Sequence, residues 1–372
     1  MHYKTGGQMK KKIEYIDGLK GIGCMMVMLG HYYCIYSLAE SFVPMPKILD
    51  ILFKIMAFFL DADLGLLFFA IISGYCIGFA KFRNVKELLW AIVKRFLRFV
   101  IPVLGANLII YMCYLLVGFH NGQTTELFAN AWFQGYYQGE YWLGLAVRDS
   151  VNTVIGKGSI MNPTFWVIYY FFIASIVVYV GSYLQGKCDN RWRYLIYVVE
   201  FVIASRYCGT NGAAIVLGSI WNKEQGHSLL EVIPKRVLAI LSVICFGLLS
   251  GGAEAVADWT HLHPVSDTWA KIFYAMVILY TIGRLESLQH IFADSRLLWL
   301  SKWSFGIYAL HWPIMCSVTS WLFLQVIFGA GTYLLIGVVT VLLVILLAIV
   351  YYYTVEWFGN NLLRIFDGWI RK

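Results

Sequence analysis

Charged side chains are scarce in this chain of 372 residues. Lys, Arg, Asp and Glu together make up 13% of it, whereas apolar side chains make up 60%. A soluble globular protein carries roughly 25% charged residues, which it needs on a surface that faces water. The composition therefore argues against a water-soluble enzyme or binding domain and predicts a protein whose surface faces lipid.

Closely spaced cysteine pairs are also missing. The eight cysteines are scattered, and none forms a pair separated by two residues. This spacing argues against both a disulfide framework and a zinc site. His261 and His263 form an HxH sequence, but no further ligand follows at a suitable spacing, so we expect no metal.

Long apolar runs are what the chain has in abundance. Such runs can cross a hydrocarbon core of roughly 30 Å, and they must be helical because lipid offers no partner to an unpaired backbone group. We predict an all-α polytopic membrane protein with about ten transmembrane helices, in which residues 1–372 form one integral-membrane domain. The runs cover residues 21–39, 64–80, 98–118, 164–184, 194–205, 210–221, 235–251, 269–284, 304–328 and 331–354.

Two other segments complete this arrangement. Residues 48–60 are expected to form a shorter helix along the outer interface. The long connection 119–163 is rich in Gly, Trp and Tyr. Because amphipathic rings settle at the headgroup level, we expect this connection to lie at a membrane surface.

Basic residues are distributed unequally between alternate loops. The amino end to Lys20, the segment 81–98, the connectors near 187–193, 223–236 and 284–302, and the carboxyl end hold 23 of the 29 Lys and Arg residues. Basic loops stay in the cytoplasm. The sequence therefore predicts cytoplasmic termini and an extracytoplasmic 119–163 connection, and it explains the net charge of +8 without nucleic acid.

Ionisable side chains inside apolar runs are expensive, and each one is a candidate for function. His31 lies 11 residues beyond Lys20, about 16 Å along a helix, and is the strongest candidate. His311 lies in the ninth run before Pro313, which should kink the helix and free a carbonyl group. Glu200 lies in the fifth run and has no partner nearby in the sequence.

Two arginines mark the start of the third run. Arg95 and Arg98 are three residues apart, so they share one helix face and can bind phosphate oxygens as a fork.

Phe68 to Tyr75 includes the adjacent small residues Ser73 and Gly74. Such residues predict close helix packing.

The ordered set of these motifs resembles acyltransferase family 3, the integral-membrane acyltransferases that modify cell-surface glycans. The resemblance spans almost the whole chain, although each motif alone is weak. Its parts are Asp17 to Ile22 with the spacing from Lys20 to His31, Phe68 to Tyr75, Arg95 and Arg98 followed by Pro102, Thr164-Phe165-Trp166, Ser304 to Pro313, and Tyr351 to Glu356.

The resemblance implies a transfer of an acyl group, most commonly acetyl, from cytoplasmic acyl-CoA to a hydroxyl of an extracytoplasmic glycan or lipid-linked sugar. It also implies a multi-pass protein of the bacterial plasma membrane. Lys20, Arg95 and Arg98 would hold the CoA phosphates. His31 would be the general base, since Asp17 is about 21 Å away along the helix and cannot orient it.

The donors that stabilise the oxyanion stay open among Ser73, Thr164, Trp166 and Tyr308. His311 competes with His31 for the role of base. It is expected only about 10–12 Å from the cytoplasmic side, near the donor channel and in a secondary role.

Two other classes of function remain. A transporter or flippase also uses polar groups at the membrane midplane, although no inverted repeat is visible in this sequence. A binding or sensor protein could use the same scaffold without activity, although the presence of His31 argues against it. Acyl-CoA hydrolysis that depends on His31 would separate all three classes.

Overall fold

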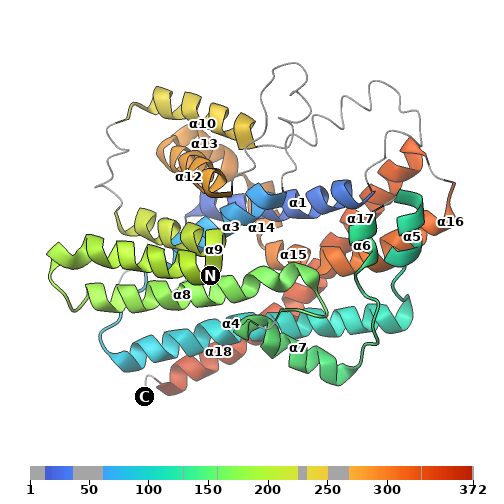
Figure 1. The fold of residues 1–372 in the computed structure, drawn as a ribbon, viewed down its shortest axis with the longest axis horizontal. Helices are drawn as coiled ribbons and strands as arrows, with labels where there is room; N and C mark the ends of the chain where they lie inside the picture. Colours follow the sequence, from blue (N-terminus) through green and yellow to red (C-terminus); the bar gives the residue numbers. More distant parts are fainter. Residues whose placement is uncertain are drawn as a thin grey trace.

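Helices form the regular structure of this protein. The computed structural model describes residues 13–36, 62–128, 130–156, 158–224, 233–249, 268–327 and 329–370, and within those ranges every regular element is helical. Helices α1 (Glu14–Tyr36), α4 (Val85–Leu116) and α8 (Trp166–Gln185) run roughly along the long axis of the molecule (Figure 1). The all-α prediction is confirmed.

Several helices are long and apolar enough to cross a membrane. Among the described residues they are Val85–Leu116, Pro163–Gln185, Ser304–Gln325 and Gly331–Gly368, and Ala62–Ile77 is a shorter apolar helix. A multi-pass membrane protein follows from this set. The interfacial helix expected at 48–60 and the HxH sequence at 261–263 lie outside the described residues.

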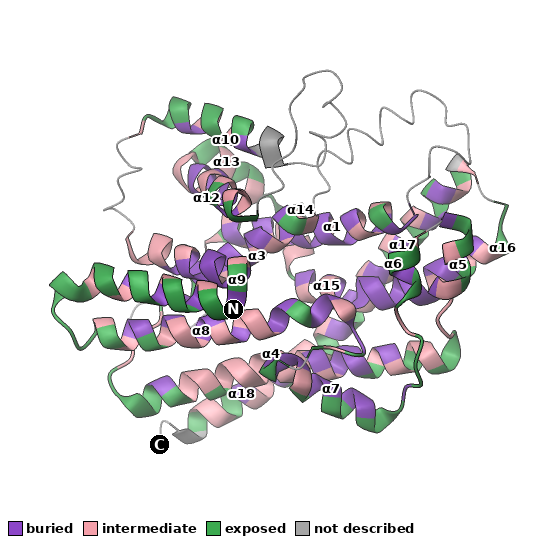
Figure 2. Ribbon diagram, in the orientation of Figure 1, coloured by how far each residue is buried: buried purple, intermediate pink, exposed green. Residues whose placement is uncertain are grey.

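The exposed surface of α17 (Ala330–Tyr351) is apolar. Leu335, Val338, Leu342 and Leu346 are each more than half exposed, and their spacing of three or four residues puts them on one helix face. Other helices also carry exposed positions on their outer faces (Figure 2). Because a continuous apolar stripe is unfavourable in water, this face of α17 suits contact with lipid tails.

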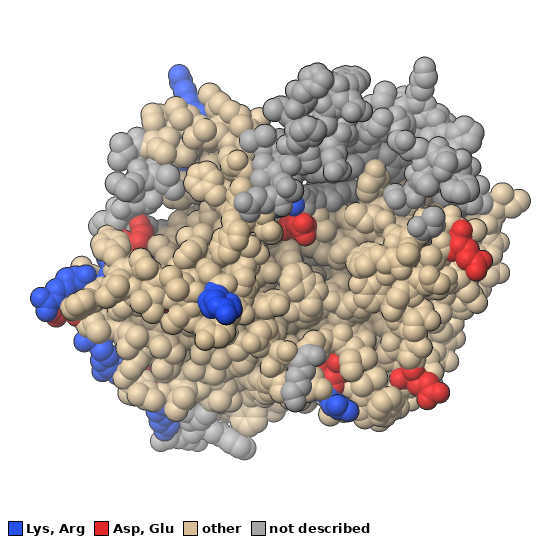
Figure 3. Space-filling view, in the orientation of Figure 1, with Lys and Arg blue, Asp and Glu red and all other residues tan. Residues whose placement is uncertain are grey.

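Basic side chains gather at one end of the long axis. Lys and Arg lie mainly where α8 and α9 (Arg193–Lys223) are joined and where α4 begins (Figure 3). Asp and Glu side chains are spread over this face, one of them near α5 (Asn121–Phe128), and most of the surface between the charged groups is uncharged. A cluster of basic residues at one end of an apolar molecule is the asymmetry that the positive-inside rule describes for membrane proteins.

Helix α3 (Ala62–Ile77) packs very closely against α9. A Cβ atom built on Gly74 would lie 1.8 Å from the carbonyl oxygen of Ile215, and one built on Gly218 would lie 1.9 Å from that of Ile71. The absence of a side chain at both glycines lets the two backbones touch. The close packing that the sequence predicted at Ser73 and Gly74 is therefore confirmed.

Helix α9 is a hairpin of two antiparallel halves. Gly209 has a φ of 57°, a left-handed conformation that reverses the chain direction there. The halves match the separate runs predicted at 194–205 and 210–221. Across the hairpin, Glu200 approaches Lys223 at 3.7 Å. It also accepts a 3.3 Å hydrogen bond from Gln185 of α8. Glu200 therefore has partners that its sequence neighbours did not reveal.

Other boundaries differ from the sequence prediction. Helix α4 begins 13 residues before the run at 98–118, and the connection 119–163 contains α5, α6 (Ala131–Gln134) and α7 (Leu143–Ile155). The last run continues from α17 through a π-helical turn into an amphipathic end helix. The remaining elements are α10 (Lys235–Leu249), α12 (Thr268–Arg284), α13 (Glu286–Phe292), α14 (Ser295–Ser301), α15 (Ser304–Ile314), the π-helical turn Met315–Thr319, α16 (Ser320–Gln325), the π-helical turn Tyr352–Glu356 and α18 (Trp357–Ile370).

Candidate active site

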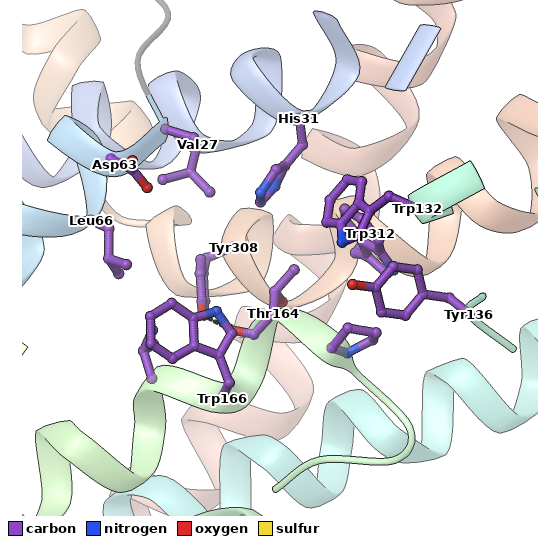
Figure 4. A pocket seen from close by; sticks show the side chains of 13 residues that line it. Val27, His31, Asp63, Leu66, Trp132, Tyr136, Thr164, Trp166, Tyr308 and Trp312 are labelled. Atoms are coloured by element: carbon purple, nitrogen blue, oxygen red, sulfur yellow. Dashed lines mark hydrogen bonds between the residues drawn. The ribbon is translucent and has the colours of Figure 1, made fainter. Parts of the chain in front are cut away.

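A cavity of about 160 Å³ lies where four helices and the 119–163 connection meet. Figure 4 shows His31 reaching from α1 toward the wall formed by Thr164 and Tyr308. Aromatic side chains flank the opening, and Trp132 and Trp166 are each about half exposed. The lining residues are Val27, His31, Ala62, Asp63, Leu66, Trp132, Tyr136, Pro163, Thr164, Trp166, Val167, Tyr308 and Trp312.

The two histidines that the sequence treated as competitors are in contact. His31 Nδ1 lies 2.9 Å from His311 Nε2, and the ring planes are within 10° of each other. His31 lines the cavity, whereas His311 is fully buried behind it. The expectation of a separate, shallower position for His311 is therefore wrong, because distances along two helices do not show where those helices touch.

A buried amide replaces the hydrogen bond that Pro313 removes next to His311. Pro313 lacks an N–H, so the carbonyl of Ala309 loses its helical partner. Asn162 Nδ2 donates to that carbonyl at 2.7 Å, while Asn162 Oδ1 accepts from the amide and the hydroxyl of Thr164 at 3.2 and 2.8 Å. Asn162 thus ties the proline-containing helix α15 to the chain segment that forms the cavity wall.

A buried carboxylate orders the loop before Asn162. Asp149 of α7 is fully buried and accepts hydrogen bonds from the hydroxyl of Ser159 and the amides of Ile160 and Met161. The amide of Asn107 in α4 reaches the same carboxylate at 3.3 Å. With these bonds the charge is compensated, so Asp149 holds the wall in place.

The predicted oxyanion donors fall into three groups. The hydroxyls of Thr164 and Tyr308 line the cavity but are engaged, the first with Asn162 and the second with the carbonyl of Thr164. The indole of Trp166 lines the cavity, and its N–H has no hydrogen bond to any described residue. Ser73 does not line the cavity, because it sits beside Arg95.

The predicted CoA-binding residues lie away from the cavity. Arg95 donates to Ser73 at 2.9 Å and to Ser175 at 3.0 Å, and its guanidinium lies 4.6 Å from the ring centre of Phe99. Arg98 follows one turn later on α4 and is half-buried. Lys20 makes a 2.9 Å ion pair with Asp17.

Three cavity features were missed from sequence. Asp63 lies one residue before an apolar run. Charged residues are common at that position, so this one did not indicate a functional site. Its carboxylate lines the cavity and lies 3.3 Å from Lys271. Trp132 and Tyr136 belong to the aromatic-rich connection. Its composition indicated a segment at the membrane surface but did not show that these two rings face the cavity.

Within the described ranges, no group of three or more His, Cys, Asp or Glu side chains is arranged to hold a metal ion. The site therefore consists of one accessible imidazole backed by a second, hydroxyl and indole groups on the facing wall, and one carboxylate. Such a set can accept a proton from a hydroxyl and can hold a polar substrate against aromatic rings.

A family model described as an acyltransferase domain matches residues 13–353. No curated protein and no solved structure matches the chain.

Proposed function

The chain belongs to acyltransferase family 3, and from that premise we propose that it transfers an acyl group from cytoplasmic acyl-CoA to a hydroxyl of an extracytoplasmic carbohydrate. Acetyl is the acyl group that we expect. The observation that carries the proposal is the cavity in which His31 reaches toward a wall of hydroxyl and indole groups.

The distance between the arginines and the cavity suits a CoA thioester. Ser73, which contacts Arg95, lies seven residues beyond the cavity residue Leu66 on α3, which is about 10 Å of helix. Ser175, the other partner of Arg95, lies eight residues beyond Val167 on α8, about 12 Å. The extended pantetheine arm is long enough for this span, so phosphates held by Arg95, Arg98 and Lys20 would leave the thioester near His31.

The proposed chemistry is a direct transfer. His31 takes the proton of the acceptor hydroxyl as its oxygen attacks the thioester carbonyl carbon, which contributes about 10²–10⁴-fold. The carbon–sulfur bond then breaks, and the leaving CoA thiolate takes the proton from the His31 imidazolium. The products are an ester and free CoA. Among the donors predicted from the sequence, Trp166 is the one that lines the cavity and remains available to the oxyanion.

The aromatic opening favours a carbohydrate as acceptor. Trp132 and Trp166 offer half-exposed ring faces, on which the apolar face of a sugar can pack. Asp63 adds an acceptor for sugar hydroxyls.

We further propose a single integral-membrane domain with ten crossings and cytoplasmic termini in a bacterial plasma membrane, as the 23-to-6 division of basic residues indicates.

Substitution of His31 tests the function. In cells that produce the His31→Gln variant, mass spectrometry should find surface carbohydrate without the ester that wild type adds. Purified His31→Gln protein in nanodiscs should lose about 10²–10⁴-fold of its acetyl-CoA hydrolysis. His290→Gln, an exposed histidine on α13, is the matched control and should behave as wild type. Wild-type turnover by the His31 variant would remove the proposal.

A further inference from the structure

We propose that His311 is a positioning residue that fixes the tautomer of His31, so that His31 Nε2 is the basic atom. This inference rests on the proposed role of His31 as base. It concerns the chain of contacts from the carbonyl of Ile307 through His311 to His31.

The chain of contacts begins at an atom that can only accept a hydrogen bond. His311 Nδ1 lies 3.1 Å from the carbonyl oxygen of Ile307, so this nitrogen must carry the hydrogen. His311 is fully buried, and no carboxylate among the described residues pairs with it. The imidazole is therefore neutral, and its second nitrogen, Nε2, bears a lone pair.

The next contact transmits this constraint to His31. His311 Nε2 can only accept, so His31 Nδ1, at 2.9 Å, must be the donor. The ring planes differ by 10° and the centroids are 5.2 Å apart, which is well beyond the N···N distance. The rings therefore meet end to end in a shared plane, where the lone pair and the N–H of an imidazole both lie.

The consequence is that the free lone pair of His31 is on Nε2. That nitrogen has no hydrogen bond to any described residue, and the ring it belongs to lines the cavity. The opposite tautomer would place two lone pairs face to face between the rings and would block Nε2 with a hydrogen. Trp312 packs edgewise on His31, with centroids 5.2 Å apart and planes at 81°, and it keeps the ring from rotating.

The same contact supports the charged form of His31. After proton transfer, His31 Nδ1–H still donates to neutral His311, so the hydrogen bond becomes charge-assisted and stronger. His311 itself gains and loses no proton. It is thereby distinguished from a second base, the role in which the sequence made it a competitor of His31.

A matched pair of substitutions tests this role. In His311→Asn the short side chain can still donate to Ile307 but does not reach His31. In His311→Gln the side-chain oxygen reaches the place of Nε2 and can accept from His31 Nδ1. The assay is acetyl-CoA hydrolysis by full-length protein in nanodiscs, with kcat and KM measured separately.

We expect His311→Asn to lower kcat by about 10- to 100-fold, as loss of an orienting partner generally does, with KM for acetyl-CoA unchanged. His311→Gln should recover most of the lost kcat. Nitrogen-15 NMR of histidine-labelled protein should show an unprotonated Nε2 at His31 in wild type and a protonated Nε2 in His311→Asn. The His31 signal is assigned by its disappearance in His31→Gln.

Two results would overturn the inference. One is an unchanged kcat in His311→Asn, and the other is a hydrogen on Nε2 of His31 in wild type. A failure of the proposed function is recognised separately, because it requires His31→Gln to turn over normally. If His31→Gln is inactive while His311→Asn is fully active, the proposed role of His311 is wrong and the proposed function stands.

Discussion

Asn162 replaces, with one side chain, the hydrogen bond that Pro313 takes away from helix α15. Its amide donates to the carbonyl of Ala309 at 2.7 Å, and its oxygen caps the short 3-10 helix Pro163–Phe165 by accepting from the amide of Thr164. Both partners are buried. A buried polar group left without a partner costs about 1–3 kcal/mol, so the stability of α15 around Pro313 depends on this amide.

We expect Asn162→Leu to lower the free energy of unfolding by about 1–3 kcal/mol. Pro313→Ala should restore an N–H to the carbonyl of Ala309 and recover part of that loss in the double variant. The measurement is a double-mutant cycle on unfolding midpoints in one detergent. Strictly additive effects of the two substitutions would show that Asn162 does not act through this carbonyl.

Single residues could be predicted from sequence where the membrane makes them costly. His31 and His311 are ionisable residues inside apolar runs, and Pro313 indicates that the carbonyl four residues before it lacks a helical partner. Their relation was not predictable, because the 2.9 Å contact depends on how α1 crosses α15. Asn162 and Asp63 lie at the ends of apolar runs, where polar residues are common and carry no signal.

At the scale of helices, the contact between α3 and α9 depends on the missing side chain of Gly74. A methyl group there would lie 1.8 Å from the carbonyl oxygen of Ile215, and a backbone atom cannot move aside as a flexible side chain can. We expect Gly74→Ala to reduce stability by about 1–3 kcal/mol through overpacking.

The control for Gly74→Ala is Gly331→Ala near the start of α17. No atom lies within 4 Å of a Cβ built there, and alanine favours the helix by about 1 kcal/mol. Thermal unfolding in the same detergent should give a lower midpoint for the Gly74 variant only. Equal midpoints for both variants would mean that α3 and α9 are not locked together at this contact.

Helix positions followed from apolar runs because lipid allows few other backbone conformations. The hairpin of α9 was readable as two short runs around Gly209. The early start of α4 was not, since residues 85–97 carry the charges that normally mark a loop. Those charges lie on a helix whose side-chain partners come from distant segments, as in the ion pair of Lys94 with Asp367.

At the scale of the molecule, the uneven charge of the two ends predicts orientation. Cys188 lies exposed in the connector between α8 and α9, at the basic end, and should face the cytoplasm. Gly139 lies in the 119–163 connection and should face outward. A membrane-impermeant maleimide on intact cells should label a Gly139→Cys variant and should reach Cys188 only after lysis.

The Cys188→Ser variant measures the background of this labelling, because it lacks the cysteine that is expected to face the cytoplasm. Cys34 and Cys76 are also exposed and are replaced by serine in every variant. Labelling of Cys188 in intact cells would reverse the orientation of the whole molecule, and with it the side from which donor and acceptor reach the cavity.

The contact between His31 and His311 also orders events during synthesis. The two residues are 280 positions apart. At 5–20 residues per second the ribosome needs about 15–60 s to make the second after the first. For that interval the first helix lies in the bilayer without the histidine that contacts its imidazole, and the cavity proposed as the acyl-transfer site does not yet exist. A chain that stops before the ninth apolar run would thus insert into the membrane without the pair of histidines on which the proposed reaction depends.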